Sequence, residues 1–233
     1  MKKCIVNYIS STPWYPSGQE RLLESLKDVN FDGDVLAFDD VNFKDCPSHS
    51  DVPYAFKPYV ITEAKNRGYD LILWLDASFW AIKSLDSIFK LMEEKGCAIQ
   101  AGGEILGLWC SDIALKKFGI SREEAIQQYI SATGLLGLNM KNEKSVEFLN
   151  RWLAYAKEKI CFKGDWRNVN HSVSNDDRVQ GHRHDMTVGS FIINQLKMPL
   201  QDCHTLFSTV GFYKKPESYK HLPSSVCFCA RGM

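Results

Sequence analysis

Short apolar runs alternate along the chain with segments in which apolar residues recur at helical spacing. The short runs predict strands over 3–10, 32–40, 71–75, 97–102 and 130–140. Helical spacing predicts helices over 19–29, 55–68, 84–96, 110–120, 121–130, 143–159 and 185–198. This alternation predicts an α/β fold, a single domain over residues 1–233 with a mostly parallel central sheet flanked by helices.

Composition removes several function classes without changing this fold. Among the 233 residues, 45% are hydrophobic and 28 Lys and Arg balance 28 Asp and Glu, so no global positive field favours nucleic acid or an anionic membrane. The N-terminal stretch MKKCIVNYISS lacks a signal-peptide cleavage site, and no apolar run reaches the roughly 18 residues of a membrane helix. The eight cysteines lack the paired spacing of a zinc site. We therefore expect a soluble, cytoplasmic protein.

A carboxylate ends the most apolar strand. Leu71 to Leu75 form a run that a parallel sheet buries on both faces, and Asp76, Ala77 and Ser78 follow at once. Ligands of open α/β sheets bind beyond the carboxyl ends of the strands. Asp76 and Ser78 are therefore candidates for holding a divalent cation and, through it, a diphosphate. The alternative is that Asp76 only caps a turn.

The stretch GHRHDMTVGSFII, residues 181–193, is a second candidate. His182, His184 and Asp185 lie directly before or at the start of a predicted helix, behind a long polar loop of a length that commonly carries function. Asp185 is a candidate for binding a ligand or, alternatively, for capping the helix. The two histidines are candidates either for metal ligands or for hydrogen-bonded structural residues.

Two further stretches suggest a phosphate and a sugar site. Lys57 precedes a proline at a predicted helix start, where an ammonium group can reach a phosphate, although most lysines are solvated surface charges. The small residues at 131–134 would allow a sugar or base to approach the backbone closely, and tight packing explains them as well.

Taken together, these pieces resemble the GT-A fold of nucleotide-sugar glycosyltransferases, distantly similar to the retaining galactosyl- and glucosyltransferases. The resemblance covers about residues 5 to 200 and lies in the order and spacing of YISSTPWYPSGQERLLESL, AFKPYVITEA, LILWLDAS, LWCSDIALKKFGISREEA and DDRVQGHRHDMTVGSFI. It implies a single GT-A-like, Rossmann-like domain. It also implies transfer of a hexosyl or pentosyl group from a nucleotide diphosphate sugar, commonly a UDP-sugar.

The resemblance implies a divalent cation, Mn²⁺ or Mg²⁺, held by an acid-x-acid motif and a C-terminal histidine. These positions match Asp76, Ser78 and either His204 or His221, with His204 as our assignment. Ser78 departs from the pattern because it replaces the second acid, and a neutral hydroxyl is a poorer metal ligand.

The resemblance also assigns the donor and acceptor contacts. Asp185 would bind donor sugar hydroxyls, with Met186 where the family has a glutamine, and Trp109 and Asp112 would border the sugar or the acceptor. Donor contacts are assigned to Tyr8, Ile9, Ser10, Lys57, Asp76, Ser78, Thr133, Gly134 and His184.

Retention is the favoured outcome, since same-face attack needs no dedicated base; Asp112 would be the base of an inverting enzyme. The acceptor stays open between a glycan, a lipid-linked glycan, a protein and a modified nucleic acid. A non-catalytic nucleotide-sugar-binding module is the main alternative, suggested by Ser78 and Met186. A nucleotidyltransferase is a weaker one, because residues 10–18 hold one glycine and no basic residue.

Overall fold

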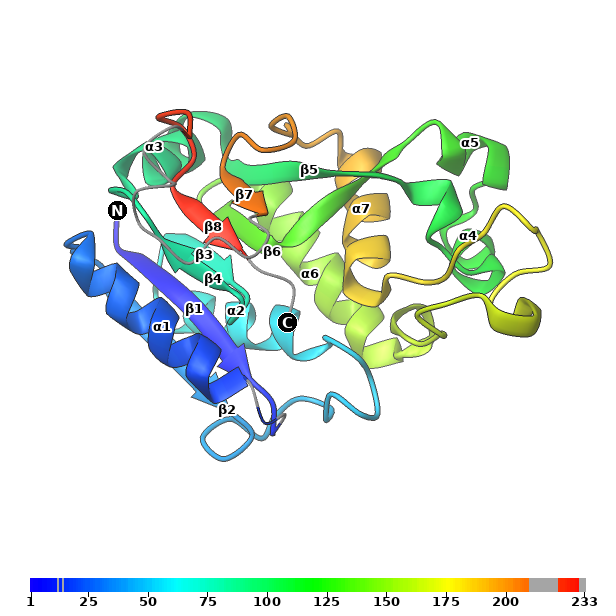
Figure 1. The fold of residues 1–233 in the computed structure, drawn as a ribbon, viewed down its shortest axis with the longest axis horizontal. Helices are drawn as coiled ribbons and strands as arrows, with labels where there is room; N and C mark the ends of the chain where they lie inside the picture. Colours follow the sequence, from blue (N-terminus) through cyan, green and yellow to red (C-terminus); the bar gives the residue numbers. More distant parts are fainter. Residues whose placement is uncertain (12, 14, 210–221, 231–233) are drawn as a thin grey trace.

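A five-stranded sheet forms the centre of the computed structural model, which describes residues 1–11, 13, 15–209 and 222–230 (Figure 1). The strand order is β2-β1-β3-β6-β5. The strands are β1 (Lys3–Ile9), β2 (Asp34–Asp39), β3 (Leu71–Leu75), β5 (Cys97–Ile105) and β6 (Tyr129–Asn139). All five had been predicted from apolar runs.

The sheet is mixed, so the prediction of a mostly parallel sheet is wrong. β1 pairs in parallel with β2 and β3, whereas β6 runs antiparallel to both of its neighbours, β3 and β5. After β5, the short helices α4 (Asp112–Phe118) and α5 (Arg122–Ile126) keep the chain at the same end of the sheet. The chain then re-enters with Tyr129 paired to Ile105, so β6 is antiparallel. An apolar run records burial on both faces and not direction, which is why the sequence did not reveal this.

Helices cover both faces of the sheet (Figure 1). α2 (Phe56–Asn66), α6 (Glu143–Glu158) and α7 (His184–Leu196) pack with one face, and α1 (Tyr15–Asp28) and α3 (Asp86–Lys95) pack with the other. Alternation along β3 feeds both cores, because Ile72 and Trp74 face α2 and α7 while Leu71, Leu73 and Leu75 face α1 and α3. The apolar run is therefore buried on both faces, as predicted.

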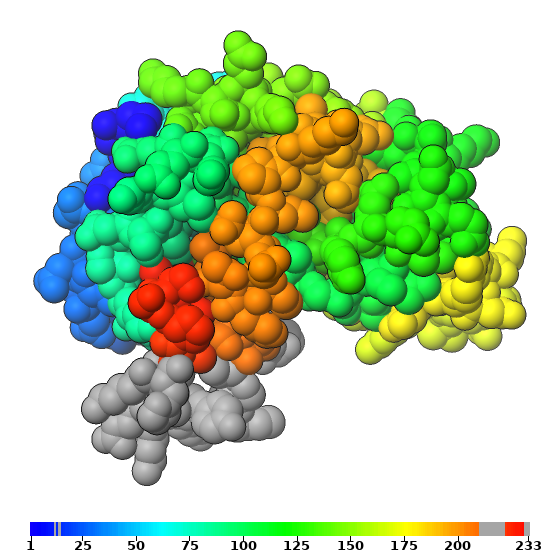
Figure 2. Space-filling model, turned by 90° about the horizontal axis from the view of Figure 1, so that it is seen from above, coloured from blue at the N-terminus to red at the C-terminus, as the bar shows by residue number. Residues whose placement is uncertain are grey.

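A second, three-stranded sheet joins the chain's C-terminal part to the tip of β3. Its order is β4-β8-β7, from β4 (Phe79–Ala81), β7 (Phe207–Thr209) and β8 (Phe228–Ala230). Figure 2 shows the β7 and β8 segments (orange and red) side by side on one face of the molecule. Strands of three residues leave no periodicity to detect, so the sequence analysis missed this sheet.

The local signals for helix ends are reliable here. α3 ends at Gly96, whose φ of 84° suits a residue without Cβ. α5 begins with a capping box of Ser121 and Glu124. Three short 3-10 helices complete the described structure: η1 (Leu106–Leu108), η2 (Ile160–Phe162) and η3 (Val169–His171). In the described part of the chain, no helix is both long and apolar enough to cross a membrane. All eight cysteines are free thiols.

Candidate functional site

One buried lysine joins two carboxylates that lie 109 positions apart in sequence, Asp76 and Asp185. Lys57 stands in the first turn of α2, and its Nζ lies 2.9 Å from Oδ1 of Asp76 and 2.8 Å from Oδ2 of Asp185. Its third contact is the carbonyl oxygen of Thr133, at 3.4 Å. The elements that meet here are α2, the end of β3, the middle of β6 and the start of α7. The structure therefore brings four of the predicted residues into one cluster.

In each carboxylate, one oxygen contacts both the lysine and a second protein donor. Oδ1 of Asp76 also accepts from the indole N–H of Trp74 at 2.9 Å, and Oδ2 of Asp185 also accepts from the hydroxyl of Thr133 at 2.6 Å. Within the described residues, no hydrogen bond reaches Oδ2 of Asp76 or Oδ1 of Asp185. These two oxygens are the remaining acceptors of the cluster; the side chain of Asp76 is 31% exposed and that of Asp185 is 3% exposed.

Lys57 stays protonated in this environment. Its side chain is only 3% exposed, and burial by itself would lower the pKa of the ammonium group. The charges of Asp185 and Asp76 outweigh that effect and raise the pKa above its ordinary value. A buried charge with two charged partners and a carbonyl uses all three of its N–H groups. Lys57 therefore acts on a ligand through its charge and through the two carboxylates that it orients.

Asp185 is not a helix cap. The N-cap of α7 is Arg183, without a side-chain capping bond, and Asp185 lies inside the first turn with its carboxylate turned to Lys57 and Thr133. This excludes the capping role, and the binding of a ligand by Asp185 stays a prediction. Met186, which stands where the family has a glutamine, packs beside the apolar core.

The two histidines before Asp185 are satisfied by the backbone. Nδ1 of His182 accepts from the N–H of Ser111 at 3.2 Å, and its Nε2 lies 2.9 Å from the carbonyl of Cys161. Burial lowers the pKa of His182 to about 4, so the ring is neutral. Nδ1 of His184 lies 3.1 Å from the carbonyl of Phe162. Both histidines are therefore hydrogen-bonded to the backbone, as the structural interpretation of these residues expects. A donor contact of His184 stays a prediction.

Two tyrosines beside the cluster were missed by the sequence analysis. The ring of Tyr54 lies 5.1 Å from Nζ of Lys57, and burial and Asp185 raise the pKa of its phenol to about 12. Tyr54 has a φ of 60°, an uncommon backbone for a bulky residue. The pKa of Tyr15, at the start of α1, is raised by burial and by Asp76. Tyr54 lies three residues before Lys57, and that spacing is the one signal the sequence offered.

The carboxyl end of β1 forms an adjacent aromatic wall. The ring of Tyr8 stacks on Phe56 at 4.4 Å, and its hydroxyl donates to Oδ1 of Asp40 at 2.5 Å. Asp40 also accepts from the backbone N–H of Ser11 at 2.7 Å, which fixes the chain just after Ile9 and Ser10. Tyr8 and Ile9 thus end β1 and Ser10 directly follows it, while their donor contacts stay predictions. Asp40, which holds this segment, was missed.

Asp112 serves as an anchor in this structure. It begins α4, where it forms a 2.6 Å ion pair with Arg122 and accepts from the hydroxyl of Ser174 at 2.7 Å. None of its described contacts is to Lys57, Asp76 or Asp185. Its role as a base therefore stays a prediction without support from the geometry. Trp109 lies under the guanidinium of Arg183, 3.7 Å from its ring centroid.

The donors for a divalent cation fit poorly. Ser78 offers only a hydroxyl, and its carbonyl accepts from Arg21 at 2.9 Å. His204 is exposed on the turn before β7, and His221 lies outside the described residues. Over the described ranges, no group of three or more His, Cys, Asp or Glu side chains could hold a metal ion. Asp76 thus provides one carboxylate oxygen beside a cationic lysine.

Gly134 leaves space at that remaining oxygen. A Cβ at this position would lie 3.2 Å from Oδ2 of Asp76 and 3.0 Å from the ring of Phe79. The backbone N–H of Asp76 donates to the carbonyl of Gly134 at 2.8 Å, so strand β6 lies directly against the acid. This contact is with the protein's own Asp76 and Phe79, as the packing alternative has it. Approach of a sugar or base to residues 131–134 stays a prediction.

Comparison with known proteins shows a shared fold at low sequence identity. No family model matches the chain, and no curated protein matches it. A glycosyltransferase involved in the glycosylation of the major capsid of PBCV-1 superposes with a TM-score of 0.55 and 13% identity, covering 99% of this chain and 93% of that one. Mouse xyloside xylosyltransferase 1 gives a TM-score of 0.54 and 10% identity, over 99% and 97% of the two chains.

The bifunctional glycosyltransferase WbbM gives a TM-score of 0.54 and 11% identity, over 98% of this chain and 45% of that one. All three are glycosyltransferases, which confirms the predicted GT-A-like glycosyltransferase fold. A fold hosts many chemistries, so what this chain does has to be argued from its own cluster of residues.

Proposed function

We propose that the chain is a glycosyltransferase that moves a sugar from a nucleotide diphosphate sugar to a hydroxyl group of an acceptor. One observation supports this proposal most directly: Lys57 holds Asp76 and Asp185 together, and among the described residues no hydrogen bond reaches the second oxygen of either acid. A sugar is a ligand with several neighbouring hydroxyl donors, so two fixed carboxylate oxygens suit it. The shared fold with three glycosyltransferases supports the same conclusion.

The described residues divide the work between binding and charge. Oδ1 of Asp185 and Oδ2 of Asp76 would accept from donor sugar hydroxyls, which fixes the ring and its anomeric carbon. Lys57 lies between the two carboxylates and pairs with both of them. The Tyr8 and Phe56 wall would face the nucleoside, and a UDP-sugar is our first choice of donor because of the resemblance in sequence.

The transfer itself requires no base from the protein if it proceeds with retention. The acceptor oxygen forms a bond to the anomeric carbon while the bond from that carbon to the diphosphate oxygen breaks. The departing diphosphate oxygen takes up the acceptor's proton on the same face. Asp185 stabilises the positive charge that develops on the sugar ring, through its own negative charge and its hold on the hydroxyls.

The test is release of nucleoside diphosphate from a panel of UDP-glucose, UDP-galactose, UDP-xylose and GDP-mannose, with mixed sugar acceptors. We expect turnover of at least one donor, and a loss of about 10²- to 10³-fold in kcat for Asp185→Asn. Asp177→Asn is the matched control, because its side chain is 93% exposed. Circular dichroism and thermal unfolding establish that each variant is folded.

Binding without turnover would favour the second candidate, a non-catalytic nucleotide-sugar-binding module. The observations that favour it are Ser78 in place of the second acid and Met186 in place of the glutamine. A thermal shift with a nucleotide sugar reports binding by mass action, and the release assay then separates the two candidates, because only the enzyme turns the bound donor over. If no member of the panel either binds or turns over, the glycosyltransferase proposal fails.

A further inference from the structure

The protein itself supplies a positive charge to Asp76, directly after β3, and to Asp185, in the first turn of α7. Lys57 lies within 2.9 Å of both Asp76 and Asp185, so one positive charge is shared by two negative charges in a buried place. A divalent cation on Asp76 would sit next to this ammonium group and would be repelled by it. The residue that would strengthen a cation site, a second acid, is replaced by Ser78. The cluster therefore has little attraction left for a second cation.

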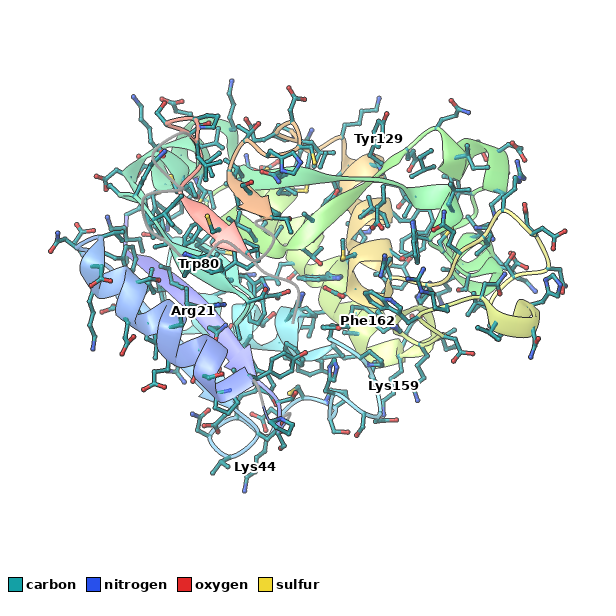
Figure 3. The ribbon with its side chains drawn as sticks, in the orientation of Figure 1. Arg21, Lys44, Trp80, Tyr129, Lys159 and Phe162 are labelled. Carbon is teal, nitrogen blue, oxygen red and sulfur yellow. The ribbon has the colours of Figure 1, made fainter. Side chains whose placement is uncertain are left out.

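A second protein cation stands at the same tip. Arg21 extends from α1, donates from Nη2 to the carbonyl of Ser78 at 2.9 Å, and places its guanidinium 4.4 Å from the ring centroid of Trp80. Figure 3 shows Arg21 and Trp80 next to one another, between α1 and β4. A guanidinium group carries five N–H donors in a fixed fork that matches phosphate oxygens.

Helix α1 holds Arg21 there through contacts with the turn after β3 and with β4. Gly18 touches the backbone of Ala77 so closely that a Cβ would lie 2.6 Å from its carbonyl oxygen. Ser25, one turn beyond Arg21, accepts from the backbone N–H of Ala81 at 2.8 Å. Residues 18, 21 and 25 lie on one face of the helix, which fixes Arg21 against the residue that replaces the second acid.

We infer that this chain binds the diphosphate of its donor without a divalent cation. The guanidinium of Arg21 would contact the diphosphate directly, and the buried charge of Lys57 would attract it without contact. The inference rests on the proposed function, because it concerns the same donor. Arg21 would stand in for the cation that the acid-x-acid pattern holds in the proteins that this sequence resembles.

The experiment measures the dissociation constants of UDP, GDP and the four nucleotide sugars by calorimetry, in EDTA and in MnCl₂. We expect at least one ligand to bind in EDTA with a Kd within about threefold of its value in Mn²⁺, well under the tenfold that equals 1.4 kcal/mol. Arg21→Gln should weaken that binding about tenfold, and Arg21→Lys less. Lys27→Gln is the control, an exposed charge on the same helix.

The outcomes separate the inference from the proposed function. Binding that requires Mn²⁺ overturns the inference and leaves the glycosyltransferase proposal intact. Binding in EDTA that Arg21→Gln leaves unchanged overturns the assigned role of Arg21, and with it the inference as stated. No binding of any ligand in either buffer removes the proposed function together with the inference. Thermal unfolding of Arg21→Gln and Arg21→Lys shows that a weaker Kd reflects the lost contact and not a lost fold.

Discussion

Lys57 is the residue on which the geometry of the site depends. An isolated buried ammonium group would be costly, but two carboxylates and a carbonyl oxygen compensate it here. The same contacts keep Asp76 and Asp185 in fixed orientations before any ligand arrives. Preorganised acceptors need no rearrangement when a sugar binds, which is the main advantage of a charged cluster over flexible surface acids.

His182 makes folding stability depend on pH. Burial lowers the pKa of its ring to about 4, whereas an unfolded histidine titrates near 6.5. Between these values the unfolded chain binds the additional proton, so the stabilising contribution is complete above pH 6.5 and is lost as the pH falls towards 4. We expect a loss on the order of 3 kcal/mol from this residue over that window. Urea unfolding across the pH range measures it.

The comparison variant for this effect is His182→Gln. Between pH 6.5 and 4, the slope of its unfolding free energy against pH should be lower than in the parent protein, by the equivalent of up to one bound proton. His171→Gln, which replaces a side chain that is 54% exposed, is the control for substituting a histidine at the surface. Equal slopes for the parent and His182→Gln would contradict the assigned neutral ring. His49 and His184 also have pKa values lowered by burial, so some pH dependence will persist in His182→Gln.

At the residue scale the sequence indicated the acids better than their partners. Asp76 stood out because a carboxylate directly follows a run that must be buried, and Asp185 because polar groups crowd before a helix. Nothing local marks Lys57 as buried, because its burial depends on two acids that arrive from other elements. Tyr54 and Asp40 were missed for the same reason, since each owes its role to contacts across the fold.

The face of α1 that contacts the β3–β4 turn controls where the first acid lies. Gly18→Ala places a Cβ 2.6 Å from the carbonyl oxygen of Ala77. The backbone has to shift to relieve this clash. We expect a loss of about 1–3 kcal/mol in the free energy of unfolding, typical of overpacking, and a lower kcat because Asp76 is displaced with the turn. Glu20→Ala, exposed on the same helix, should change neither. Unchanged unfolding of Gly18→Ala would contradict the tight packing.

Element identity was predictable where an element is long enough to show a period. All the helices of eight or more residues, and every strand of the large sheet, had a matching segment in the sequence. β4, β7 and β8 have three residues each and were missed. The direction of β6 was also missed. It depends on the end of the sheet at which the chain emerges from α4 and α5, and not on the residues of the strand itself.

At the scale of the whole molecule, two long loops are held by charges from distant segments. Asp51, in the loop before α2, lies 3.0 Å from both Lys159 and Lys163, which joins it to the end of α6. Asp112 joins α4 to Arg122 and to the loop at 163–183. Figure 2 shows this loop (yellow) at the opposite end of the molecule from α1. Composition and spacing predicted that these loops exist but not what they contact.

Substitution of Asp112 distinguishes two roles for its carboxylate, holding the loop at 163–183 and acting as a base in the reaction. Because it already accepts from Arg122, Ser174 and the N–H of Asn175, we expect Asp112→Asn to loosen residues 163–183. Hydrogen exchange in that loop should quicken about tenfold, for roughly 1.4 kcal/mol of lost local stability. Turnover should fall far less than in Asp185→Asn, and Asp177→Asn in the same loop should change neither. A collapse of kcat with unchanged exchange would restore Asp112 as a base, and with it an inverting mechanism.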